Sequence, residues 1–137
     1  MELGMKKVFV GTYEFGYEHI RLYLRSGTGA ETDLMPKDKG ITVIEIGADR
    51  KEWRQIVGSL LHEAQEIPMQ RLGYSYSAVS NLNQSTANCV FMMTHEQFDE
   101  CCHRAGDLLA RALPDLARAW TAWKKLGGKS NEILRNP

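Results

Sequence analysis

The sequence predicts a single α+β domain, in which an N-terminal antiparallel hairpin and a central strand pack against two or three helices. Three observations support this prediction. Residues typical of strands fill much of the chain before position 48, apolar residues recur at helical spacing from Trp53 onward, and 137 residues suffice for one domain. We place the domain at residues 1–128 and expect residues 129–137, after the Gly127-Gly128 stop, to form a flexible C-terminal tail.

The strand predictions come from residue type and alternation. Residues 6–15 are rich in β-branched and aromatic side chains, and residues 17–25 alternate between apolar and polar side chains, so the two runs predict an antiparallel hairpin. Residues 26–40 are rich in turn formers and predict an exposed loop. Residues 41–47 (ITVIEIG) predict a third strand, and apolar side chains on both of its faces indicate a central position in the sheet.

An apolar stripe at helical spacing predicts the first helix, and its members are Trp53, Ile56, Val57, Leu60, Ala64 and Ile67. We expect Asp49 to be the N-cap, with Glu52 three residues further on. Pro68 lacks the amide that the next backbone hydrogen bond needs, so we expect it to kink or end this helix.

A short buried strand at residues 89–93 and a second helix complete the prediction. Thr94 is the expected N-cap, with Gln97 in a capping box, and Pro114 should break or bend the helix. Its buried stripe is predicted to comprise Phe98, Cys101, Cys102, Ala105, Leu108, Leu109 and Leu113. We interpret Trp120 and Trp123 as core residues, with a protein-binding or self-association patch as the alternative.

Composition excludes several classes of function. Lys plus Arg and Asp plus Glu both number 17, so the net charge is zero and bulk charge attracts neither nucleic acid nor an anionic membrane. Three cysteines, two of them adjacent, do not form a disulfide framework and are typical of a reducing compartment. No apolar run is long enough for a signal peptide or a membrane span, so we expect a cytoplasmic protein.

The first helix carries the strongest chemical motif, His62-Glu63-Ala64-Gln65-Glu66. Side chains at positions i and i+4 project from the same side of a helix, so His62 and Glu66 can bind one metal ion. Glu63 is placed to take a proton from a metal-bound water, as a general base. We expect Gln55 and Ser59 to support this site, and we expect its polar face to be separate from the face that builds the core.

A strand, a short loop and a helix that carries HExx(H/E) resemble the core of zincin-like metallopeptidases, and VGSLLHEAQE is similar to their active-site helix. The resemblance covers residues 41–73 and implies a zinc-dependent hydrolase that acts on a peptide or protein substrate. In the gluzincin branch the third ligand is an acidic residue on a later helix. The resemblance thus implies a third ligand among His95, Asp99 and His103, which stand at i, i+4 and i+8. Small members of this kind recur among phage and mobile-element proteins.

Glu66 stands where the family pattern has a second histidine. A carboxylate can ligate zinc, but the replacement also fits a degenerate site. The alternative is a solvated polar helix face on a metal-free binding module, such as a phage-encoded inhibitor of a host defence complex. That module could be a homodimer, and exposed aromatic side chains such as Tyr74, Tyr76 or Trp123 would then contact its partner.

Overall fold

The computed structural model describes residues 6–32, 40–72, 75–77, 89–91 and 93–126. It confirms the α+β architecture. The elements are β1 (Lys7–Phe15), β2 (Glu18–Arg25), β3 (Ala30–Thr32), β4 (Ile41–Gly47), α1 (Trp53–Arg71), β5 (Ser75–Ser77), β6 (Cys89–Phe91) and α2 (His95–Lys125). Tyr74 and residues 129–137, on which two of the predictions fall, lie outside the described residues.

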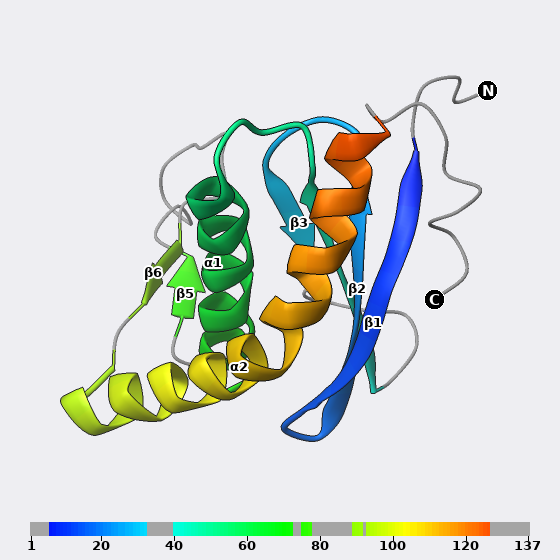
Figure 1. Cartoon of the computed structure of the whole chain (residues 1–137). Coiled ribbons are helices and arrows are strands. Elements are labelled where there is room, and N and C mark those ends of the chain that lie inside the picture. The colour runs from blue at the N-terminus through cyan, green and yellow to red at the C-terminus, as the bar shows by residue number, and fades with distance from the viewer. Residues whose placement is uncertain (1–5, 33–39, 73–74, 78–88, 92, 127–137) are drawn as a thin grey trace.

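The main sheet has the strand order β1-β2-β4-β3 (Figure 1). The predicted hairpin is confirmed, because β1 and β2 pair antiparallel around a two-residue turn at Gly16 and Tyr17. The central position predicted for β4 is also confirmed, because β4 pairs with β2 in parallel and with β3 antiparallel. A second, two-stranded sheet pairs β5 with β6, in agreement with the short strand predicted near residue 90.

Strand β3 lies within the segment that the sequence predicts to be loop, so that prediction is wrong for Ala30–Thr32. The pairing is set by the edge of β4, where the Gly47 amide donates to the Gly29 carbonyl at 2.7 Å and the Thr32 hydroxyl donates to the Val43 carbonyl at 2.9 Å. Three residues are too few to show a strand periodicity of their own. Strand β3 therefore forms because β4 provides its hydrogen-bond partners, and not because of a pattern in its own three residues.

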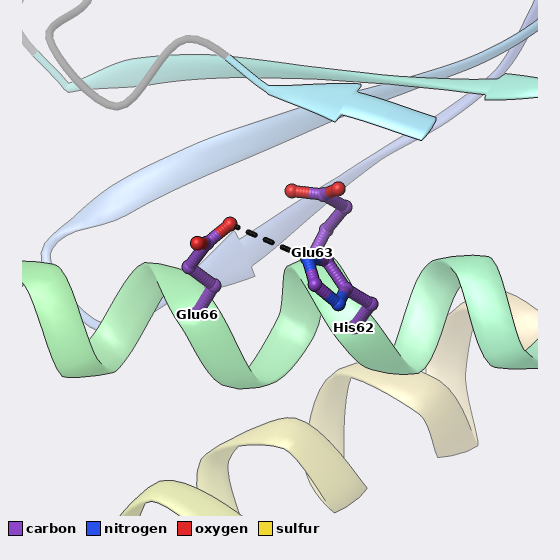
Figure 2. Close-up of side chains that lie close together, drawn as sticks. All are labelled: His62, Glu63 and Glu66. Carbon is purple, nitrogen blue, oxygen red and sulfur yellow. Dashed lines mark ion pairs between the residues drawn. The ribbon is translucent and has the colours of Figure 1, made fainter. Parts of the chain in front are cut away.

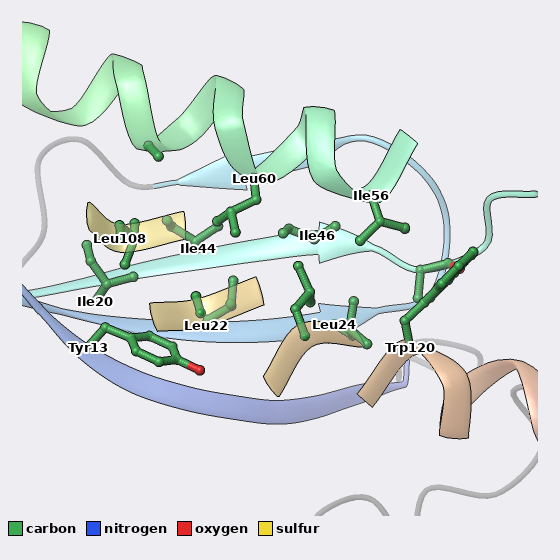
Figure 3. Packing of buried hydrophobic residues seen from close by; sticks show 14 of the residues in the cluster. Tyr13, Ile20, Leu22, Leu24, Ile44, Ile46, Ile56, Leu60, Leu108 and Trp120 are labelled. Atoms are coloured by element: carbon green, nitrogen blue, oxygen red, sulfur yellow. The ribbon is translucent and has the colours of Figure 1, made fainter. Parts of the chain in front are cut away.

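Both helices cover one face of the main sheet, and the core fills the space between them (Figures 1 and 3). Alternate residues of β2 (Ile20, Leu22 and Leu24) point into this core, as the sequence predicts. The opposite face carries charged side chains together with the aromatic rings of Phe9 and Tyr23. There Glu45 forms ion pairs with Lys7 at 2.8 Å and with Arg25 at 3.7 Å.

The helix caps agree with the sequence in one helix and differ in the other. Thr94 caps α2 and forms the expected capping box with Gln97. The N-cap of α1 is Glu52, with Gln55 as its partner, so the assignment of Asp49 as N-cap is wrong. The Asp49 carboxylate instead accepts hydrogen bonds from the Gly27 amide at 2.6 Å and from the Trp123 indole at 3.1 Å, which joins two loops to the end of α2.

The two helical prolines end neither helix. Helix α1 continues through Pro68 to Arg71, and α2 continues through Pro114 to Lys125, although Figure 1 shows α2 bending along its length. Each proline removes one backbone hydrogen bond. Burial of Ile67 and Leu116 next to the prolines offsets that loss, because packing supplies most of the stability of helices in proteins.

The C-terminal half of α2 belongs to the core. Trp120 and Trp123 are both buried, which confirms the core interpretation, and the Trp120 indole donates to the Ala48 carbonyl at 2.9 Å. Trp123 therefore offers no contact surface. Phe98 is exposed, so the buried stripe of α2 starts at Cys101 rather than where the sequence predicts. No helix in the described ranges has the length and apolarity needed to cross a membrane.

Candidate metal site on helix α1

His62, Glu63 and Glu66 lie together in the middle of α1, where each offers one ligand atom within 4.8 Å of the others. Figure 2 shows the His62 and Glu66 side chains facing each other, with 3.7 Å between the imidazole Nε2 and the carboxylate Oε1. The helix itself sets this geometry, because residues four apart are neighbours on its surface. Nitrogen and carboxylate oxygen atoms thus lie near one another on this helix, as the spacing predicts.

Glu63 differs from its two neighbours because only 4% of its surface is exposed. Its side chain points toward the strands (Figure 2), and its Oε1 atom has no hydrogen-bond partner among the described residues. The expectation that the chemical face and the core face are separate is therefore wrong. Glu63 follows Leu60 by three residues and precedes Ile67 by four, so helical periodicity places it on the buried stripe.

The surroundings of Glu63 favour its neutral form. Burial raises the pKa of this carboxyl above its usual value of 4.5. The imidazole of His62 opposes that shift and lowers the pKa, whereas the charges of Glu66 and Glu31 raise it further. Glu31 lies on β3, where it forms an ion pair with Arg25 at 3.3 Å. No pattern in the sequence indicates that the charge of Glu31 acts on Glu63.

The two residues expected to support the site serve the helix instead. The Ser59 hydroxyl donates to the Gln55 carbonyl at 3.0 Å, one turn earlier in α1. The Gln55 side-chain oxygen accepts from the amides of Lys51 and Glu52 at 3.2 and 3.0 Å, which caps the helix. Neither side chain is therefore aimed at His62 or Glu66.

The three candidate third ligands on α2 do not join this group. Asp99 and His103 form an ion pair of their own, with 3.3 Å between the carboxylate Oδ2 and the imidazole Nε2, and His95 is exposed. The side of α2 that meets α1 carries Cys102, whose sulfur lies 4.0 Å from the Gln65 amide nitrogen. His103 is one residue further along the helix and hence turned by about 100° from that contact.

Among the described residues, His62, Glu63 and Glu66 form the single cluster of three potential ligands. No family model, curated protein or solved structure matches this chain. Any functional conclusion must therefore rest on the chemistry of the site itself. The arrangement offers an imidazole and a carboxylate that can share a cation, beside a buried carboxyl group that can accept a proton.

Proposed function

We propose that the α1 site binds one divalent metal ion, with zinc as the ion that best fits its ligands, and that the protein is a zincin-like hydrolase of peptide bonds. His62 and Glu66 would hold the metal, and Glu63 would act as the general base. One observation carries the proposal. The Glu63 carboxylate is buried directly beside a histidine and a second carboxylate, and its Oε1 atom has no hydrogen-bond partner in the described part of the chain.

A metal ion would relieve an unfavourable arrangement. A buried polar atom without a hydrogen bond costs free energy, and buried carboxylates are ordinarily paired or bound to metals. Glu66 lies beside Glu63 and raises its pKa, so the two carboxylates repel each other when both are charged. A cation shared by His62 and Glu66 would neutralise part of this charge, and a nitrogen-and-oxygen ligand set is one that zinc accepts.

When bound, the metal would supply a water of lowered pKa and would polarise the scissile carbonyl. Glu63 would accept the proton of that water on its carboxylate, and its raised pKa brings it closer to the neutral range in which a general base works best. His62 would have to be neutral to serve as a ligand, so the metal would replace the contact that the imidazole makes with Glu66.

Metal content and hydrolysis, measured on the same untagged protein, test the proposal. We expect about one zinc ion for each chain and cleavage of an unstructured protein such as casein, both lost in the double variant His62→Ala/Glu66→Ala. The matched control is Asp99→Ala/His103→Ala, which removes the other histidine–carboxylate pair. Absence of zinc uptake by the unaltered protein, or equal loss in both double variants, would leave the metal-free binding module as the better description.

A further inference from the structure

A groove with an apolar floor lies between the β1–β2 turn and the C-terminal end of α1. Its volume is about 320 Å³, and its floor includes Phe15, Ile67, Pro68 and Leu72. Figure 1 shows the turn at the end of the sheet where α2 passes beneath α1. Side chains from the β1–β2 hairpin and from both helices thus form this surface, because Arg104 of α2 lines it as well.

The charged groups at the groove are paired within the chain. Arg71 forms an ion pair with Glu18 at 2.9 Å, and Arg104 forms one with Glu100 at 2.9 Å. A charged ligand would have to compete with these pairs, whereas an uncharged ring can lie on the apolar floor beside them. An arginine next to a ring can also contribute a cation–π contact. The chemistry of the groove therefore fits an aromatic side chain.

Tyr17 lies at the rim of the same groove, and its side chain is fully exposed. It occupies the second position of the two-residue turn, after Gly16, whose φ of 66° is the conformation that this turn requires. The turn needs the glycine, but nothing in the turn needs a tyrosine, because small polar residues usually follow the glycine. The exposed ring and the apolar groove together offer the protruding group and the receiving cavity of an interface centre.

We propose that Tyr17 of one copy of this chain docks in the groove of a second copy, and that the second copy reciprocates about a two-fold axis. A two-fold interface uses the same patch on both subunits, so each patch must contain both the protruding group and the cavity that receives it. This surface meets that requirement because the turn carries the ring and also forms part of the groove. Tyrosine and arginine are also the residues enriched in interface centres.

The contact is small, so the dimer is weak. An aromatic side chain buries roughly 150–250 Å², and two rings with their grooves stay below about 1,200 Å², the range of transient complexes. The fraction of dimer should therefore rise with protein concentration. Nearly all of the protein should be dimeric only at the highest concentrations that can be prepared. This inference is independent of the metal site.

Sedimentation equilibrium of the full chain, at concentrations up to about 1 mM, tests the dimer. We expect the weight-average mass to rise from the monomer value of 15.5 kDa toward twice that value. Tyr17→Ser should remain monomeric, since serine suits the turn and removes the ring, whereas Tyr17→Phe should still associate. The matched control is Phe98→Ser, which removes another exposed aromatic ring that does not line the groove and should leave association unchanged.

A second experiment tests the groove as the receiving surface. Isotope-labelled Tyr17→Ser protein, titrated with unlabelled wild-type protein, keeps its groove and meets an intact tyrosine, so amide shifts should change at Gly16 and Leu72. The proposal is overturned by a monomeric wild-type protein at every concentration. It is equally overturned by undiminished association of Tyr17→Ser, or by shift changes confined to residues outside the groove.

Discussion

Two histidine–carboxylate pairs with the same spacing lie on the two helices, and they differ in what surrounds them. His62 and Glu66 on α1 are 3.7 Å apart, and Asp99 and His103 on α2 are 3.3 Å apart. The α2 side chains are 62% and 78% exposed, and no third ligand joins them among the described residues. The α1 pair instead adjoins Glu63, a carboxyl buried in the core stripe.

The comparison shows that spacing alone does not make a chemical site. Both pairs satisfy the i, i+4 rule, and in water either one contributes little to stability. What distinguishes α1 is a buried carboxyl group whose Oε1 atom receives no hydrogen bond from any residue that the structure describes. Such a group destabilises the protein, so its position calls for a function.

The largest expected effect comes from removing the buried acid while keeping its shape. Glu63→Gln should lower the rate of peptide hydrolysis by about 10²–10⁴-fold, the usual contribution of a general base, because an amide cannot take up the proton. Zinc binding should persist, because His62 and Glu66 remain. The measurement is hydrolysis rate and zinc stoichiometry on one preparation. Glu96→Gln, on the exposed first turn of α2, is the control and should change neither.

If Glu63→Gln removes zinc together with activity, Glu63 is a ligand rather than the base. If it leaves hydrolysis at the wild-type rate, the assignment of Glu63 as general base is wrong.

The next effect concerns stability, and its sign is fixed by the raised pKa of Glu63. A carboxyl whose pKa is higher in the native state than in the unfolded state keeps its proton longer when the protein is folded. The metal-free protein should therefore lose stability as the pH rises above 4.5, the usual pKa of a glutamate, through the higher native pKa. Glu63→Gln should lose less stability across that range.

Urea denaturation in the presence of a chelator, repeated across this pH range, measures the difference between the two proteins. At neutral pH the variant should be more stable by about 1 kcal/mol, because glutamine carries no charge that burial would penalise. Parallel pH profiles for wild type and Glu63→Gln would mean that Glu63 is not desolvated in solution.

The sequence was sufficient for the parts of the fold that local patterns encode. Alternation in residues 17–25 gave β2, and apolar residues on both faces of residues 41–47 gave the central position of β4. β3 was missed because its three residues are ordered by hydrogen bonds to β4 rather than by a pattern of their own. The sequence left open whether Pro68 and Pro114 end the helices or only bend them, and tertiary packing decides that both helices continue.

The candidate site was predictable in composition but not in environment. Helical spacing brought His62, Glu63 and Glu66 together correctly. The sequence prediction placed Glu63 on the polar face because its side chain is charged. Its position between Leu60 and Ile67, however, already put it on the buried stripe. The effect of Glu31 could not be found from sequence, because β3 and α1 are far apart in the chain and are brought together by tertiary structure.

A third prediction uses the departure from the zincin-like pattern. Glu66→His restores the second histidine of HExxH and removes one of the carboxylates that raises the pKa of Glu63. We expect zinc affinity to increase on the order of tenfold, equivalent to about 1.4 kcal/mol, as measured by competition with a coloured chelator. Asp99→His is the matched control on α2, where a second histidine gains no buried partner. An equal increase in both variants would mean that the surroundings of α1 add nothing.

The smallest expected effect is the stability of the α2 pair itself. Exposed ion pairs at i, i+4 contribute about 0.3–0.5 kcal/mol, and less at high salt, because water and ions screen them. Asp99→Asn should therefore lower the free energy of unfolding by no more than that amount, in urea denaturation at low and high salt. A loss several times larger would show that the α2 pair interacts with a group outside its own helix. The surroundings of the two pairs would then no longer distinguish α1 from α2.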